Sequence, residues 1–421
     1  MRPLPFAATT ALALSLSHAA LAATPAEVVD TYADIAEAGY ADSLSTAQEL
    51  QAAIEAFLDA PSPEGLDAAR AAWIASRAPY QQTEVFRFGN PIVDDWEGKV
   101  NAWPLDEGLI DYVDASYGGA TDENQLAALN VIANPTLSIA GQEVDASTIT
   151  PELIAGTLDQ ADGVESNVAR GYHAIEFLLW GQDLNGHGPG AGDRPWTDYA
   201  QGADCTNGNC DRRADYLRAA TQLLVDDLAW MAAQWAEGGA AREAVTTDPQ
   251  AGLQAMLTGM GSLSYGEQAG ERMRLGLMLN DPEEEHDCFS DNTHNSHYYD
   301  GLGVQNVYLG RYVRPDGGLV EGPSLRDLVA DTDPALAEEI TAKLDTTVAA
   351  LDAIRTAAEN GTAYDTMLEA GNAEGERLVM AGVDGLIDQT RSFERAIAAL
   401  GLDAVAFEGS DSLDNPDAVF Q

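Results

Sequence analysis

The segment Gly171-Tyr172-His173-Ala174-Ile175-Glu176-Phe177-Leu178-Leu179-Trp180-Gly181 has the apolar periodicity of a helix and carries one histidine and one glutamate within it. At 3.6 residues per turn its aliphatic residues form one stripe, and His173 and Glu176 lie on the opposite side with Phe177 and Trp180. Since both sides bear large apolar residues, we expect this helix to be buried all round.

An imidazole and a carboxylate buried on such a helix need compensation. A His-x-x-Glu pair places one nitrogen and one oxygen within reach of the same metal ion, a recurrent arrangement in helical bundles. A hydrogen bond between His173 and Glu176 would satisfy both groups as well. The helix alone leaves these two interpretations open.

A second polar face lies on the helix predicted from Glu64 to Phe88. Its members are spaced four, three, four and three residues apart, so they share one side: Trp73, Arg77, Tyr80, Glu84 and Arg87. A solvated surface would not place Trp and Tyr in register with two arginines and a glutamate. We therefore predict a face that lines a polar interior cleft, with an exposed ion-pair ladder as the alternative.

The helix predicted from Ala251 to Leu279 carries a third polar face, formed by Ser264, Glu267, Glu271 and Arg274. Glycines interleaved with these residues would let another backbone approach closely. This face is predicted either to bind a ligand or to pack the two halves of the chain together with a salt-bridged rim.

The chain is strongly acidic: 69 Asp and Glu residues against 21 Lys and Arg residues give a formal net charge of −48. Such a surface repels nucleic acid and anionic lipid and attracts cations. We therefore expect no nucleic acid partner. Solubility in a salty environment is a second explanation for the excess of acid.

Residues 1–22 have the features of a secretory signal peptide, with Arg2 followed by an apolar stretch from Leu4 to Leu21. We therefore expect an exported protein. No later apolar run reaches the roughly 20 residues that span a bilayer, so no transmembrane segment is expected in the mature chain.

Three cysteines, Cys205, Cys210 and Cys288, are compatible with one disulfide in an oxidising compartment and one remaining thiol. Cys205 and Cys210 flank a turn-rich loop and could pair locally. A bridge between Cys210 and Cys288 is equally open.

Strand signals are nearly absent, and the pattern predicts an all-α protein. The mature chain exceeds the usual single-core limit of ~250–300 residues, so we expect two four-helix bundles in tandem with long loop insertions. The expected divisions are an N-terminal bundle over 23–205, a C-terminal bundle over 206–405 and a poorly ordered acidic tail over 406–421. Helices are predicted over 25–60, 64–88, 164–180, 211–235, 251–279, 334–360 and 374–400.

The segment 281–323 is predicted to be a long loop, and such loops are often functional. Its histidines, His286, His294 and His297, could bind a metal ion together with Asp287 and Asp291. Capping and hydrogen bonds within the loop are the alternative interpretation.

Several of these stretches resemble one known family. The segment from Gly171 to Gly181 resembles the G-x-H-x-x-E signature of the imelysin-like family, whose members are also described as insulin-cleaving metallopeptidase homologues. Four further stretches are similar to its iron-regulated protein A subgroup: Pro79–Gly89, Val100–Glu107, Gly266–Met273 and Cys288–His294.

The resemblance implies two helical bundles related by internal duplication, a site at or near their interface, and a periplasmic or outer-membrane-associated role in iron acquisition. It also implies that His173 and Glu176 are metal ligands, with Glu84 as the third ligand or as the acid of the site. The chain lacks H-E-x-x-H and H-x-x-E-H, so the common zinc-peptidase arrangements do not apply.

Three hypotheses for function follow. The first is a binding protein for a divalent or trivalent metal ion, iron before zinc or copper, free or in a small metal-bearing ligand. It would serve a membrane-associated uptake partner. The second is a metal-dependent peptidase in which Glu176 or Glu84 is the base. The third is a non-catalytic interaction module. The expected ligand contacts are Arg77, Tyr80, Arg87, Ser264, Glu267 and Glu271.

Overall fold

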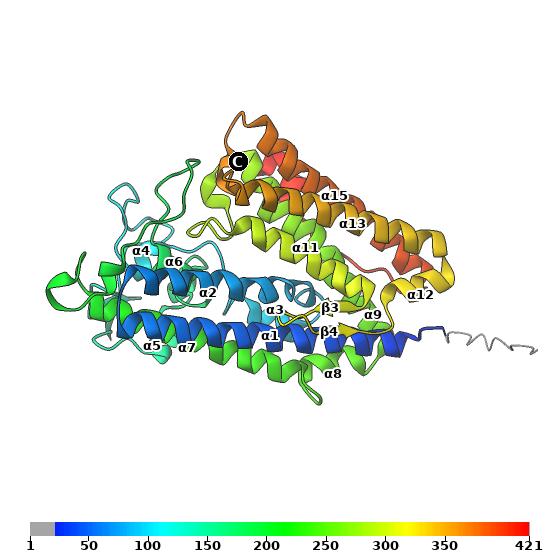
Figure 1. The fold of residues 1–421 in the computed structure, drawn as a ribbon, viewed down its shortest axis with the longest axis horizontal. Coiled ribbons are helices and arrows are strands. Elements are labelled where there is room, and N and C mark those ends of the chain that lie inside the picture. Colours follow the sequence, from blue (N-terminus) through cyan, green and yellow to red (C-terminus); the bar gives the residue numbers. More distant parts are fainter. Residues whose placement is uncertain (1–21, 421) are drawn as a thin grey trace, which may run out of the picture.

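The computed structural model describes residues 22–420, and the expected signal peptide lies, apart from Ala22, outside them. The all-α prediction is confirmed (Figure 1). Strands occur in the described residues only as two short antiparallel hairpins. They pair β1 (Thr136–Ile139) with β2 (Gln142–Asp145), and β3 (Arg311–Val313) with β4 (Leu319–Glu321).

Four helices form an N-terminal group. The long helix α1 (Pro25–Asp59) packs against α2 (Pro63–Gln81) and α7 (Cys210–Trp235), which run beside it in Figure 1. The short helix α6 (Gly171–Trp180) packs against α2 and α7. The quoted segment therefore lies inside this group.

Helix α2 is shorter than the predicted 64–88. It ends at Gln81, two residues after Pro79, which has no N–H to donate to the helix ladder. A separate 3-10 turn, η1 (Glu84–Phe86), follows. The predicted continuous face is therefore wrong beyond Tyr80, since Glu84 follows the end of the helix.

A second group is formed by α9 (Pro249–Ser262), α11 (Thr293–Leu309), α13 (Pro334–Glu359) and α15 (Ala373–Ala399), with the π-helix η6 (Leu263–Arg274). The helices predicted over 334–360 and 374–400 are confirmed.

The prediction of a loop over 281–323 is wrong for α11. This helix packs against α2 on one side and α13 on the other, so it buries polar residues and glycines as well as apolar ones. A helix covered on two sides has no single apolar stripe, and the periodicity that reveals surface helices is missing.

The two groups do not divide at residues 205 and 206. Helix α7 packs with the N-terminal helices, whereas the expected boundary placed it in the C-terminal bundle. One apolar core runs through both groups, and a smaller core lies among η6, α13 and α15. Internal duplication stays a prediction.

The acidic tail is packed rather than loose. The close approach predicted for the glycines of η6 is confirmed, because a Cβ on Gly266 would lie 2.6 Å from the carbonyl oxygen of Glu408. Ser412 donates to the carbonyl of Gly270, and Tyr265 donates to Asp414. Because these glycines have no side chains, the tail can pack directly against the backbone of η6.

Cys205 and Cys210 form the disulfide, and Cys288 is a free thiol. Within residues 22–420 no helix is long and apolar enough to cross a bilayer. The remaining helical elements are short. The α-helices are α3 (Pro91–Glu97), α4 (Glu107–Ile110), α5 (Pro151–Leu153), α8 (Ala240–Thr246), α10 (Leu275–Leu279), α12 (Leu325–Thr332), α14 (Tyr364–Leu368) and α16 (Asp411–Asp414). The others are η2 (Ile154–Leu158), η3 (Ala161–Gly163), η4 (Trp196–Tyr199), η5 (Gly202–Asp204), η7 (Pro282–Glu284) and η8 (Pro416–Phe420).

Candidate metal centre

Helix α6 begins at Gly171, not at Val164 as predicted. Gly171 has φ +82°, and an added Cβ would lie 2.6 Å from the carbonyl oxygen of Val100. The same carbonyl accepts the N–H of Tyr172 at 2.7 Å. Every residue of α6 is buried, which confirms the expectation of a helix covered on all sides.

His173 and Glu176 form the hydrogen bond that the sequence left open. His173 Nδ1 lies 2.9 Å from Glu176 Oε2, and the two side chains are 1% and 0% exposed. The other carboxyl oxygen of Glu176 accepts the N–H and the hydroxyl of Ser290. Glu176 is therefore fully engaged, whereas His173 Nε2 is buried without a hydrogen-bond partner in the described residues.

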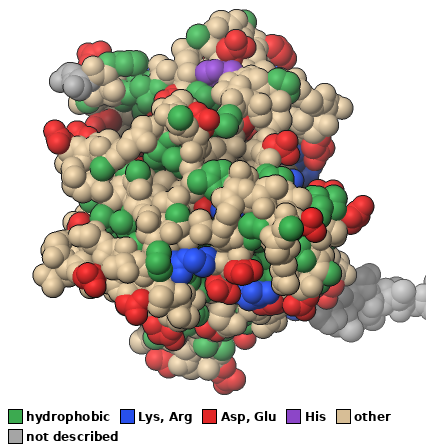
Figure 2. Space-filling view, turned by 90° about the vertical axis from the view of Figure 1, so that its left-hand side faces the viewer, with side chains coloured by type: hydrophobic (Ala, Val, Ile, Leu, Met, Phe, Trp, Pro, Cys, Tyr) green, Lys and Arg blue, Asp and Glu red, His purple; other side chains and the backbone are tan. Residues whose placement is uncertain are grey.

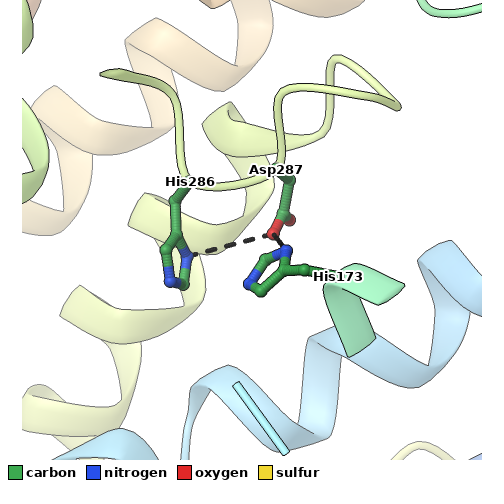
Figure 3. A group of neighbouring side chains, drawn as sticks. All are labelled: His173, His286 and Asp287. Carbon is green, nitrogen blue, oxygen red and sulfur yellow. Dashed lines mark ion pairs between the residues drawn. The ribbon is translucent and has the colours of Figure 1, made fainter. Parts of the chain in front are cut away.

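Two further residues complete the centre. The rings of His173 and His286 lie edge to face with centroids 4.8 Å apart. Asp287 Oδ1 lies 3.8 Å from His173 Nδ1 and 3.9 Å from His286 Nδ1 (Figure 3). One donor atom from each residue lies within 4.8 Å of the other two, so these three side chains could bind one ion. All three are buried.

Asp287 is held by a buried arginine. Arg77 Nη2 donates to Asp287 Oδ1 at 2.8 Å, and Asn292 and Ser296 donate to Oδ2. Arg77 itself lies over the rings of three aromatic residues, the nearest being Tyr172 at 4.8 Å. Arg77 is therefore buried rather than part of an exposed ion-pair ladder, and a ligand contact by Arg77 stays a prediction.

Burial sets the protonation of the centre. It lowers the pKa of His173 to about 3 and that of His286 well below the usual range, so both imidazoles are neutral. Burial alone would raise the pKa of Asp287, but Arg77 lowers it to about 2. Neutral imidazoles and an ionised carboxylate are the protonation states in which these groups bind metal ions.

His173 Nε2, which is buried without a hydrogen-bond partner in the described residues, is an atom that a bound metal ion could satisfy. Metal-binding histidines commonly donate their other ring nitrogen to a carboxylate, which orients the ring. The contact between His173 Nδ1 and Glu176 allows this arrangement in the tautomer that carries its proton on Nδ1, which leaves Nε2 for an ion. Two imidazoles and one carboxylate are a donor set that suits iron, zinc and manganese. The residues present therefore fit a metal ion.

Glu84 lies in a different cluster. Its carboxylate pairs with Arg272 at 2.8 Å, and Arg272 also pairs with Glu267 and Asp300. In residues 22–420 no ion pair or hydrogen bond joins Glu84 to His173. The structure thus brings together His173 and Glu176 but gives Glu84 another partner.

The face of η6 is divided among three surroundings. Ser264 accepts a hydrogen bond from Gln389 in α15, Glu267 binds Arg272, and Glu271 is exposed. The π-helix is the reason, since its i→i+5 turn brings Glu267 over Arg272 and displaces the face expected at α-helical spacing.

The other predicted contacts are near the centre without belonging to it. Tyr80 is buried and packs against Tyr172, with ring centroids 5.0 Å apart. Arg87 pairs with Asp94, Glu97 and Glu267.

The loop histidines separate in the structure. His286 and Asp287 lie beside His173, which agrees with the metal-binding interpretation of this loop. His294 contacts Asn295, and the ring of His297 packs against Tyr364. The adjacent His-Asp pair was the signal available in the sequence, but nothing local connected it to α6.

A pocket of about 920 Å³ opens beside the centre. His286 lines it, and Trp103 packs edge-on against the His286 ring with centroids 6.1 Å apart. Glu97 lines the same pocket near Arg87. The pocket reaches the trio at His286, the one member that lines it. Asp and Glu side chains are scattered over the face of the molecule shown in Figure 2.

Glu97 gives a prediction for the pH dependence of stability. Burial, and then repulsion by Glu84, raises the pKa of Glu97 from 4.5 to about 7. A raised pKa in the folded state stabilises the fold below the unfolded pKa and loses this contribution as the pH rises through about 7. Between about pH 5 and 8 the free energy of unfolding should therefore fall by about 1–3 kcal/mol more in the wild type than in Glu97→Gln.

Denaturant unfolding at both pH values measures this difference. The exposed Glu49→Gln variant changes the net charge equally and should retain the wild-type profile. An unchanged pH profile for Glu97→Gln would contradict the prediction.

Known proteins match the chain over most of its length. A family model described as imelysin matches residues 36–393. Iron-regulated protein A of Synechococcus elongatus is 24% identical over 316 residues, which are 75% of this chain and 71% of that protein.

Two crystal structures share the fold. One, described as an iron-regulated protein A precursor from Parabacteroides distasonis, has a TM-score of 0.64 at 19% identity and covers 91% of this chain and 97% of that one. The other, an imelysin-like protein from Psychrobacter arcticum, has a TM-score of 0.55 at 18% identity and covers 92% and 99%. At these identities the likeness concerns the fold alone.

Proposed function

The chain belongs to the imelysin family, and from this premise we propose that it is an exported protein that binds a metal ion, iron first, in the service of iron acquisition. The ligands are His173, His286 and Asp287. Glu176 orients His173 from behind rather than binding the ion. The observation that carries the proposal is that one donor atom each from His173, His286 and Asp287 lies within 4.8 Å of the other two, with His173 Nε2 buried and without a hydrogen-bond partner in the described residues.

The choice of iron rests on two kinds of support. A relative over three quarters of the chain bears the name iron-regulated protein A. In addition, a carboxylate and two imidazoles form a mixed oxygen and nitrogen site, which suits iron better than copper(I), since copper(I) prefers sulfur ligands. Zinc is the alternative ion for the same donors. A periplasmic location, possession of a cleaved signal peptide and a membrane-associated uptake partner are part of the proposal.

The centre is less suited to peptide hydrolysis. A metallopeptidase needs a base free to take a proton from water. Glu176 already accepts hydrogen bonds from Ser290 and pairs with His173, and Glu84 is paired with Arg272. We therefore favour binding over catalysis.

Metal titration of the purified chain tests the proposal. After chelator treatment, the wild type is expected to bind about one Fe²⁺ per chain under anaerobic conditions, with Zn²⁺ competing. The His173→Ala/His286→Ala variant should bind almost none, because it leaves a single carboxylate as ligand. Glu176→Gln should retain the stoichiometry and lose about 10–100-fold in affinity, as expected for a residue that orients a ligand.

The control removes two histidines outside the trio, as His187→Ala/His294→Ala. This variant should bind Fe²⁺ like the wild type. Glu84→Gln should do the same, which separates the present ligand set from the one expected from the sequence. Equal metal content in the wild type and the His173/His286 variant would refute the proposal.

A further inference from the structure

The pocket beside the centre reaches one of the three donor residues, His286. His286 belongs both to its wall and to the trio, and its Nδ1 is buried without a hydrogen-bond partner in the described residues. His286 is 4% exposed, so it is a buried part of the pocket wall. A volume of about 920 Å³ leaves room for an ion with its hydration shell.

The wall of the pocket is acidic. Two arginines line it, Arg87 and Arg272, and each is already paired with several carboxylates. Six glutamates line it as well: Glu97, Glu165, Glu267, Glu271, Glu283 and Glu284. Because these carboxylates already neutralise both arginines, neither arginine is available to bind an anionic ligand.

Three of these glutamates are exposed, and no described basic side chain pairs with them. They are Glu165, Glu271 and Glu283, and they come from three separate segments of the chain. No described basic side chain compensates their negative charges, although burial, and then repulsion by Glu107, raises the pKa of Glu283 to about 7, so that this side chain is only partly ionised near neutral pH. A cleft lined by one sign of charge raises the local concentration of the opposite ion and its rate of association.

We propose that this pocket is an entry vestibule that delivers a hydrated metal cation to His286, and that it excludes metal carried in an anionic chelate. The inference rests on the proposed function and specifies its ligand. A cation enters along the attractive field and exchanges water for the buried donors of the centre. An anionic chelate meets uncompensated carboxylates instead, and like charges brought together in an interface oppose binding.

Stopped-flow association of Fe²⁺ under anaerobic conditions tests the vestibule, with tryptophan fluorescence as the signal because Trp103 packs against His286. The Glu165→Gln/Glu271→Gln/Glu283→Gln variant should associate about tenfold more slowly at low salt and bind the same number of ions. The difference should vanish near 1 M salt, where the Debye length is about 3 Å.

The matched control is Glu49→Gln/Glu237→Gln/Glu243→Gln, which neutralises three exposed glutamates outside the pocket. It should associate at the wild-type rate to within about a factor of two, because distant charges are screened. The wild-type rate should itself fall with added salt. Equal rates for the pocket variant and this control, or a wild-type rate independent of salt, would overturn the vestibule while leaving metal binding intact.

Two further arms test the ligand class. Ferric citrate offered at equal iron concentration should leave citrate in solution, and retention of citrate with iron on the chain would overturn the exclusion of anionic chelates. A lysine-rich peptide that bound the metal-free pocket in competition with Fe²⁺ would reassign the pocket to a basic peptide. A wild type that binds no Fe²⁺ would overturn the proposed function and the vestibule together.

Discussion

Replacing Arg77 by methionine is expected to lower the free energy of unfolding by about 3–5 kcal/mol. Arg77 and Asp287 are 1% and 0% exposed and 2.8 Å apart. Methionine retains much of the apolar contact with Trp73 and Tyr172 but removes the charge. Asp287 would then be a buried carboxylate without its cation, and an unpaired buried charge is the costly outcome.

Denaturant unfolding of the single and double variants isolates the pair. Arg77→Met/Asp287→Asn should recover part of the loss, because the charge left behind is removed with its partner. Arg377→Met, which breaks an exposed pair with Glu374, should change stability by no more than about 1 kcal/mol. A loss of that small size for Arg77→Met would contradict the prediction.

The same variant connects stability to metal binding. A cation bound beside Asp287 would compensate the missing arginine, so Arg77→Met should bind Fe²⁺ more tightly than the wild type, and the same concentration of Fe²⁺ should raise its Tm more.

Replacing Gly171 by alanine is expected to cost about 2–4 kcal/mol, from a left-handed backbone with a side chain and from overpacking. The new Cβ would lie 2.6 Å from the carbonyl oxygen of Val100, which also accepts the N–H of Tyr172. Since His173 is two residues further along, relief of the clash would move the start of α6 and the imidazole with it.

Thermal unfolding and Fe²⁺ titration should therefore both change in Gly171→Ala. The matched control is Gly156→Ala, where an added Cβ has no neighbour within 4 Å and φ is not positive. That control should retain wild-type stability to within about 1 kcal/mol and full metal affinity. A wild-type Tm for Gly171→Ala would show that the helix start tolerates a side chain.

Local patterns were sufficient for one part of the candidate site. Residues three apart on a helix face the same side, so the approach of His173 and Glu176 follows from their spacing. The full burial of α6 follows from its apolar residues on both sides, and the contact of another backbone with η6 follows from its glycines. These features depend only on neighbours in the chain.

Other parts depended on contacts between distant segments. The other members of the centre, His286 and Asp287, come from the segment before α11, and no periodicity relates that segment to α6. Glu84 was expected beside His173, yet its partner Arg272 lies on η6. A π-helix shifts the hydrogen-bond register by one residue, which an α-helical pattern does not contain.

The sequence by itself determined an all-helical chain with a buried His-Glu pair, because side-chain periodicity decides which side of each helix is covered. Only the tertiary structure decided that His286 and Asp287 meet His173, that Arg77 stabilises Asp287, and that an acidic pocket leads to them. The physical reason is that the pattern of apolar residues along each helix determines which of its sides is buried. Ion pairs and metal sites instead depend on which distant helices and loops come into contact in the folded chain.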